Sequence, residues 1–239
     1  MPKSSVDQIR ARFDQDVERF SNLEIGQTTT VDSPLMLELV TQAAAANNPA
    51  AAHLLDVGCG AGNYTLKLLQ SLPDLEVTLL DLSQPMLARA VERIHSVSSA
   101  TIHAIQGDIR ETTFPASQFD VILAAAVLHH LRAADQWRAV FAKFHQVLKP
   151  GGSLWIVDLV EQSTQAVQAI MWQRYEDYLV DFKGPAFREQ VFGYIEEEDS
   201  PRPLIFQLDL LRQVGFEQVE ILHKNNLFAA FGAIKASKA

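Results

Sequence analysis

The sequence predicts an α/β protein built on a doubly wound, mostly parallel sheet, and three observations support this. Short apolar runs alternate with amphipathic segments, as in consecutive βαβ units. The first run ends at Val57 and leads through a glycine turn into a helical pattern. The second run ends at Asp81, about 20 residues beyond those glycines. A strand, a glycine turn and a helix, with an acid at the next strand tip, indicate a small-molecule site.

The core of the chain contains five expected strands with helices between them. The strands are expected at residues 52–57, 76–81, 101–106, 119–124 and 153–158, and the helices at 62–71, 84–96 and 134–148. Right-handed crossovers put the strand ends with Gly58, Asp81, Asp108 and Ala125 on one rim, outside which ligands of such sheets bind. The turn reads GxGxG and not GxGxxG, which disfavours a dinucleotide.

Two helical segments are expected before this core. Residues 4–20 carry apolar side chains at spacings of three and four, which gives the segment one apolar face. A second helix is expected from Pro34 to about residue 46, with Ser33 as its N-cap.

A segment rich in aromatic residues follows the fifth strand. In residues 160–204, Trp172, Tyr175 and Tyr178 recur near helical spacing. The spacing fits one face of a lid or dimerisation helix, and it also fits an aromatic wall for an apolar or planar substrate. The acidic run 196–199 is expected to be a solvated turn, and a last helix, 204–214, ends at Gly215.

Composition and charge limit the classes of protein that the chain can belong to. Its 239 residues suffice for one large domain, and no window approaches the roughly 18 apolar residues of a membrane span. The N-terminus lacks the apolar region of an export signal, and the single cysteine, Cys59, fits a reducing cytoplasm. A net charge of −9 argues against a broad nucleic-acid surface.

Six motifs, in order and at matching spacing over residues 54–157, resemble those of class I S-adenosylmethionine-dependent methyltransferases. Three resemble the cofactor motifs of the family: DVGCGAG at 56–62, LDLS at 80–83 with Met86, and GDI at 107–109. The later landmarks are FDVI at 119–122, LHHL at 128–131 and LKPGG at 148–152. The resemblance implies a seven-stranded, Rossmann-like methyltransferase fold with an antiparallel last strand. Residues 219–222 and 227–234 are expected to form the closing antiparallel pair, with a turn at 224–226. It implies S-adenosylmethionine as cofactor and methyl transfer to a small-molecule acceptor.

The resemblance also assigns roles around the cofactor. Asp56 is expected to hold the glycine turn and the cofactor's ammonium, although a buried acid satisfied by loop N–H groups is the structural alternative. Asp81 is expected to accept from the ribose hydroxyls, and Asp108 with Ile109 to meet the adenine. The predicted cofactor site comprises Asp56, Gly58, Cys59, Gly60, Asp81, Leu82, Met86, Asp108, Ile109 and Ala125.

His129 is the candidate catalytic residue, and two interpretations of it remain open. Methyl transfer needs a base only when the nucleophile carries a proton, and a histidine of ordinary pKa suits that role. The LHHL stretch also resembles one shared by methyltransferases with unrelated substrates, which favours a structural role such as capping the next helix. No metal is expected in the site.

The resemblance divides the chain into four parts of a single domain. Residues 1–48 are an N-terminal helical segment, expected either to pack on the domain or to close over the cofactor, and residues 49–158 are the cofactor-binding core. Residues 160–203 are a lid in which Trp172 and Tyr175 face the acceptor, with a homodimer across the Trp172 helix as an alternative. Residues 204–239 supply the closing helix and the antiparallel strands.

Two other functions are weighed against methyl transfer. Residues 214–216, 226–228 and Phe13-Asp14 resemble the branch that contains the carboxy-S-adenosylmethionine synthase of tRNA wobble uridine modification. That enzyme holds its extra carboxylate with an arginine, and neither Arg188 nor Arg202 aligns securely with it; its asparagine after the fourth strand is Ala125 here. The second alternative is a binding protein that keeps the cofactor site without the chemistry.

Overall fold

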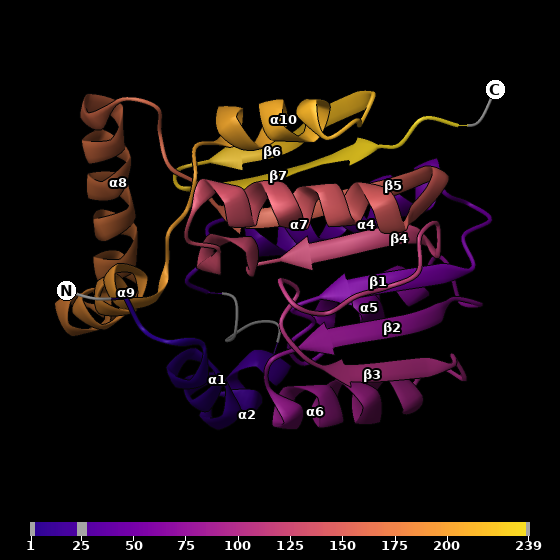
Figure 1. Cartoon of the computed structure of the whole chain (residues 1–239). Coiled ribbons are helices and arrows are strands. Elements are labelled where there is room, and N and C mark those ends of the chain that lie inside the picture. Colours follow the sequence, from indigo (N-terminus) through magenta and orange to yellow (C-terminus); the bar gives the residue numbers. More distant parts are fainter. Residues whose placement is uncertain (1–2, 23–27, 238–239) are drawn as a thin grey trace.

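The computed structural model of the chain describes residues 3–22 and 28–237. Its centre is a seven-stranded sheet in the order β3-β2-β1-β4-β5-β7-β6 (Figure 1). β7 runs antiparallel to both of its neighbours, and the pairs among β1 to β5 are parallel. The predicted fold is therefore confirmed. The strands are β1 (His53–Val57), β2 (Glu76–Asp81), β3 (Ile102–Gln106), β4 (Phe119–Ala125), β5 (Leu148–Leu159), β6 (Gln218–Asn225) and β7 (Phe228–Ile234).

Helices cover both faces of the sheet. Successive residues of β1, Leu54 and Leu55, are fully buried in two different apolar clusters, as expected of a strand covered on both sides. α4, α5 and α6 pack on one face, and α7 and α10 on the other. The helices are α1 (Val6–Gln15), α2 (Val17–Ser21), α4 (Ser33–Asn47), α5 (Asn63–Leu69), α6 (Gln84–His95), the 3₁₀ helix η1 (Leu128–His130), α7 (Ala134–Val147), α8 (Gln165–Lys183), α9 (Pro185–Glu198) and α10 (Leu204–Gln213).

The chain order places the carboxyl ends of β1, β2 and β4 together. From β1 the chain runs outward to β2 and β3, then returns to the other side of β1 as β4, so the strand order reverses between β1 and β4. A site at that reversal is expected of open α/β sheets. α8 stands to one side of this edge and α1 and α2 lie below it (Figure 1).

Two predicted helix boundaries at the N-terminal side were wrong. The segment 4–20 is two helices, interrupted at Asp16, whose carboxylate pairs with Arg19 at 3.5 Å. α4 begins at Ser33, so Asp32 and not Ser33 is its N-cap. Asp32 adopts left-handed backbone (φ 59°) and its carboxylate accepts from His223 and Asn225 of β6, so tertiary contacts move the start of the helix.

The predicted C-terminal strands and the acidic turn also need correction. β6 extends to Asn225, and the turn is Asn226 with Leu227, because Asn226 tolerates the left-handed φ of 51°. β5 begins at Leu148, which pairs with Phe119 before an irregularity, and not at residue 153. The acidic run is not a solvated turn, since its first three residues complete α9 and Glu198 is buried.

The division into flap, core, lid and closing elements stays a prediction. In the described part of the chain, no helix combines the length and the apolar composition that crossing a membrane requires.

Candidate functional site

A cavity of about 460 Å³ lies where the carboxyl ends of β1, β2 and β4 meet. All ten predicted cofactor residues line it, together with His129 and Tyr175. Trp172 is not among the described residues that line it. The topology therefore gathers side chains that the sequence spreads from Asp56 to Tyr175.

The glycine turn after β1 is held against its neighbouring loops. The N–H groups of Gly58 and Cys59 both donate to the carbonyl of Leu80, at 2.7 and 3.2 Å. Gly58 adopts a φ of +65°, and a Cβ there would lie 2.6 Å from Cγ2 of Val127. Only glycine satisfies this conformation and this close approach together. Gly60, also at positive φ, has open space on its Cβ side.

Asp81 ties the glycine turn to the start of α6. One carboxylate oxygen accepts from the Gly60 N–H at 2.9 Å, and the other accepts from the Ser83 N–H at 2.8 Å. Burial raises its pKa, while these N–H donors oppose the rise. Each carboxylate oxygen has a second lone pair, so Asp81 keeps the capacity to accept from hydroxyls in the cavity.

Asp56 is 1% exposed. Its carboxylate accepts from the Thr65 hydroxyl of α5 at 2.6 Å and not from the loop N–H groups of the structural alternative, and its expected role in holding the glycine turn and the cofactor's ammonium stays a prediction. Burial, together with the charge of Asp81, raises the pKa of Asp56 to about 7. The site therefore holds two carboxylates whose ionisation a bound cation would favour.

Asp108 is engaged by its own loop. The backbone N–H and the guanidinium of Arg110 donate to its carboxylate. Burial raises the pKa of Asp108, but the Arg110 hydrogen bonds outweigh it and leave the pKa below its usual value. Lys143 of α7 donates to the carbonyls of Ile109, Arg110 and Thr112 and fixes the loop. An adenine contact to Asp108 stays a prediction, and it would share the carboxylate with Arg110.

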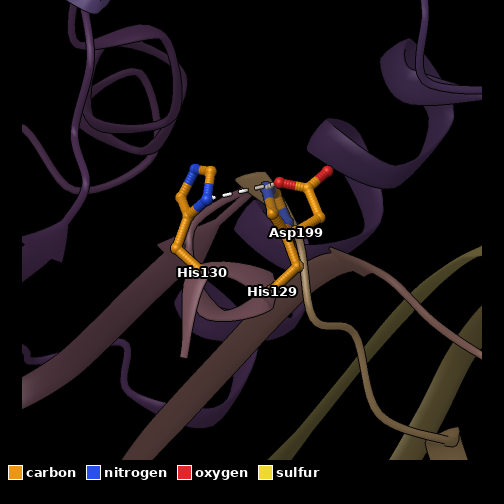
Figure 2. A group of neighbouring side chains, drawn as sticks. All are labelled: His129, His130 and Asp199. Carbon is orange, nitrogen blue, oxygen red and sulfur yellow. Dashed lines mark ion pairs between the residues drawn. The ribbon is translucent and has the colours of Figure 1, made fainter. Parts of the chain in front are cut away.

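His129 lies beside Asp199 (Figure 2), and it also contacts Asp158. Its Nδ1 contacts Asp158 at the end of β5, and its Nε2 lies 3.6 Å from Asp199. Burial lowers its pKa, but the charges of Asp199 and Asp158 outweigh this and raise it to about 9. His129 thus carries a proton at neutral pH, and its role as a general base stays a prediction. The N–H groups of Leu128 and His129 also donate to Asp158, which caps η1.

His130 is the neutral member of the pair. Its ring centroid lies 4.4 Å from that of His129, and its Nδ1 lies 3.3 Å from an oxygen of Asp199. Burial and the charge of His129 lower its pKa. Among the described residues, neither ring nitrogen of His130 has a hydrogen-bond partner, and both are buried.

Side chains of α1, α2 and α9 also line the cavity. Arg12 of α1 donates from two nitrogens to the carboxylate of Glu198, the last residue of α9. The Ser83 hydroxyl donates to Asp14 at 2.6 Å, and the Asn63 amide donates to the carbonyl of Phe20 at 3.0 Å. The N-terminal segment is therefore attached both to α9 and to the rim of the sheet.

The two predicted acceptor residues occupy different positions. Tyr175 is buried in the wall of the cavity, and its hydroxyl donates to the carbonyl of Thr29 at 2.7 Å. The Trp172 ring packs against Tyr175 and Phe192, with centroids 6.2 and 5.0 Å apart, so it supports the wall from behind. Contact between either residue and an acceptor stays a prediction.

Sequence reasoning missed Asp158, Asp199 and the Arg12–Glu198 pair. A signal existed for Asp158, because it ends the fifth apolar run as Asp81 ends the second. No local pattern marks Asp199, whose partners lie about 70 residues earlier in the chain.

The comparisons with known proteins find methyltransferases. A family model described as a methyltransferase domain matches residues 54–152. The demethylmenaquinone methyltransferase of Listeria monocytogenes is 24% identical over 174 residues, which cover 71% of this chain and 72% of the relative.

Solved structures share the fold. The 1,6-didemethyltoxoflavin-N1-methyltransferase of Burkholderia thailandensis, with 1,6-didemethyltoxoflavin and S-adenosylhomocysteine, gives a TM-score of 0.63 at 18% identity, over 99% of this chain and 93% of that one. Human N-acetylserotonin methyltransferase with S-adenosylmethionine also gives 0.63 at 18% identity, over 99% of this chain and 61% of that longer one. Two further structures are matched over 55% and 63% of their length. The domain match over residues 54–152, the curated relative and these shared folds together support the class I S-adenosylmethionine-dependent methyltransferase superfamily, whose cofactor is S-adenosylmethionine.

Proposed function

We propose that the chain transfers the methyl group of S-adenosylmethionine to a small, largely apolar acceptor that binds in the same cavity. The observation that carries this proposal is the continuity of the cavity. It runs from the glycine turn and Asp81 to the apolar side chains of Ile9, Phe13 and Ile195. A cofactor at the rim and an acceptor under α1 and α9 would then lie next to each other.

The residues at the rim fit the cofactor. The glycine turn offers close backbone approach, Asp81 keeps lone pairs for hydroxyls, and Asp56 with Asp81 favours a cation. When bound, S-adenosylmethionine supplies a methyl group on a positively charged sulfur, which is displaced in line with the acceptor. The chain's contribution is to orient the two molecules and to exclude water. The N-terminal helix α1 is held over the site by two contacts, Arg12–Glu198 and Asp14–Ser83.

The acceptor side of the cavity supports an apolar or planar molecule. Tyr175, Val191 and Phe228 line it with Phe13, whose ring stands edge-on to His130 at 6.0 Å. The relative and the solved structure described above are named for demethylmenaquinone and 1,6-didemethyltoxoflavin. We propose an acceptor of this size and apolar character for the present chain, with His129 and His130 as its polar neighbours.

The assembly and location that we propose have narrower support. Exposed Val167 and Ile170 on α8 favour a homodimer across that helix. The single cysteine favours the cytoplasm.

The test is to follow a labelled methyl group. The purified protein is incubated with methyl-labelled S-adenosylmethionine and an extract of the cells that produce it, which is then separated into organic-soluble, protein and RNA fractions. We expect the label in the organic-soluble fraction, and a short-chain demethylmenaquinol serves as a defined probe. Label in a water-soluble derivative of S-adenosylmethionine would contradict the proposal and favour the synthase alternative. If the protein binds S-adenosylhomocysteine but no fraction receives label, the non-catalytic binding protein becomes the favoured alternative.

A further inference from the structure

We propose that His129, His130 and Asp199 form a binding site for one divalent transition-metal ion in the wall of the cavity. The three side chains meet where η1 faces the end of α9, as Figure 2 shows. The donor atoms are Nε2 of His129, Nδ1 of His130 and Oδ1 of Asp199. Metal binding itself does not depend on the proposed function.

The spacing of these donor atoms fits a small coordination sphere. Oδ1 of Asp199 lies 3.6 Å from Nε2 of His129 and 3.3 Å from Nδ1 of His130, and the three ligand atoms lie within 4.8 Å of one another. Zinc–nitrogen and zinc–oxygen bonds of about 2.0–2.2 Å place the ligands of a tetrahedral site about 3.3 Å apart. Small side-chain rotations therefore suffice to bring all three atoms onto one ion.

His130 supplies independent support for a ligand here. Both of its ring nitrogens are buried; within the described part of the chain, Nδ1 has an ion-pair contact with Asp199 at 3.3 Å and Nε2 has no hydrogen-bond partner. Buried polar atoms in native proteins nearly always have a partner. A metal ion between His130 and Asp199 would replace this long contact with two short bonds, one to Nδ1 and one to the carboxylate.

Asp158 orients His129 as such a site requires. It engages Nδ1 of His129 and is itself held by two backbone N–H groups of η1. This leaves Nε2 directed toward Asp199 (Figure 2). Ligating histidines commonly use their second nitrogen in this way, on a carboxylate that fixes the ring.

The ligand set indicates which metals fit and what the site offers. Two imidazoles and one carboxylate suit zinc, iron, cobalt or nickel better than magnesium or calcium. Three protein ligands leave coordination positions open, and His129, His130 and Asp199 all line the cavity. An oxygen of the acceptor could occupy an open position. That last role rests on the proposed function.

The experiment uses the full-length protein, stripped with a chelator and then titrated with Zn²⁺ and, separately, Co²⁺. We expect one equivalent bound by mass spectrometry of the metal, and a visible absorption band of four- or five-coordinate cobalt. His130→Gln and Asp199→Asn should each weaken Zn²⁺ binding by at least tenfold, and Asp158→Asn by about 10- to 100-fold. His103→Gln, an exposed histidine beside Glu76, is the matched control and should bind as the wild type does.

Three outcomes would overturn the site: no bound equivalent at micromolar free Zn²⁺, a cobalt spectrum of six-coordinate aqueous type, or equal loss in His103→Gln. S-adenosylhomocysteine binding, measured on every variant, reports whether the fold and the cofactor site persist. If a variant fails that control, the wild-type cobalt spectrum decides. If the protein transfers the labelled methyl group but binds no zinc, the metal site alone is refuted. If it binds zinc but transfers no methyl group, the proposed function alone is refuted.

Discussion

At the scale of single residues, the cavity is dominated by two acids at neighbouring strand tips. Asp56 is the residue before the last of β1 and Asp81 is the last of β2, and the charge of Asp81 adds to burial in raising the pKa of Asp56. The hydroxyl and the backbone N–H of Thr65 donate to the Asp56 carboxylate, but they do not outweigh burial. Its ionised form is therefore unfavourable until a cation arrives.

The free energy of unfolding should depend on pH through Asp56. In the folded chain this carboxyl keeps its proton up to about pH 7, whereas the unfolded chain loses it near the ordinary value of 3.8. The folded state binds more protons between these values, so stability falls as pH rises through that window. Asp56→Asn removes the effect, and the difference in unfolding free energy between wild type and variant should change by up to about 4 kcal/mol from pH 4 to pH 8. Urea denaturation at several pH values measures it.

The control for this measurement is Asp177→Asn, at an exposed acid of α8. Its stability should follow that of the wild type at every pH. A constant offset between wild type and Asp56→Asn across pH 4 to 8 would show that Asp56 titrates as an ordinary surface acid.

The sequence reveals residues whose role is local. Gly58 and Asp81 could be placed from the sequence, because a glycine turn and an acid after an apolar run mark strand ends wherever they occur. Asp199 and Glu198 could not, because their roles depend on partners from η1 and α1. A run of four acids is usually solvated, and here tertiary contact decides otherwise.

At the scale of elements, apolar periodicity placed the strands of the core, and their tertiary contacts set several boundaries. β2 matches its predicted residues, 76–81, because a buried strand between turns is defined by its own sequence. The start of α4 was missed because Asp32 is held by β6, which no local pattern shows. The covering of the cavity likewise depends on contacts between elements at the two ends of the chain.

Arg12→Met should loosen the N-terminal helices without unfolding the sheet. The substitution keeps an apolar stem and removes the guanidinium that holds Glu198, whose side chain is 6% exposed. Hydrogen bonds to charged groups contribute about 1.5–3 kcal/mol, so amide hydrogen exchange over residues 6–21 should quicken roughly 10- to 100-fold. Exchange in β1 and β4 should not change.

Arg10→Met is the matched control, because Arg10 is on the same helix and, among the residues that the structure describes, its ion pair is with the exposed Asp7 three residues away. Its exchange should resemble that of the wild type. Equal quickening in both variants would mean that loss of charge on α1, and not the contact with α9, loosens the segment.

At the scale of the whole molecule, the cavity joins parts of the chain that are far apart in sequence. Its lining extends from Ser4 to Phe228 and includes α1, the turns after β1 and β2, η1 and α9. The fold could be predicted because alternating βαβ units admit few topologies. The packing of α1 and α9 at the cavity could not be predicted, since it depends on a side-chain pair, Arg12–Glu198, between elements far apart in sequence. Because the lining comes from elements throughout the chain, a ligand in the cavity should raise the free energy of unfolding of the whole domain.

S-adenosylhomocysteine should stabilise the protein against heat, and NAD should not. A ligand at a hundred times its Kd adds about 2.7 kcal/mol, which for a chain of this size raises the Tm by roughly 5–11 °C. NAD should give no shift, because the GxGxG turn lacks the dinucleotide spacing. Asp81→Asn turns an acceptor of the Gly60 or Ser83 N–H into a donor and should reduce the shift, whereas Asp74→Asn, at an exposed acid before β2, should keep it. A full shift in Asp81→Asn would remove Asp81 from the cofactor site, and an equal shift with NAD would contradict the assignment of the cavity.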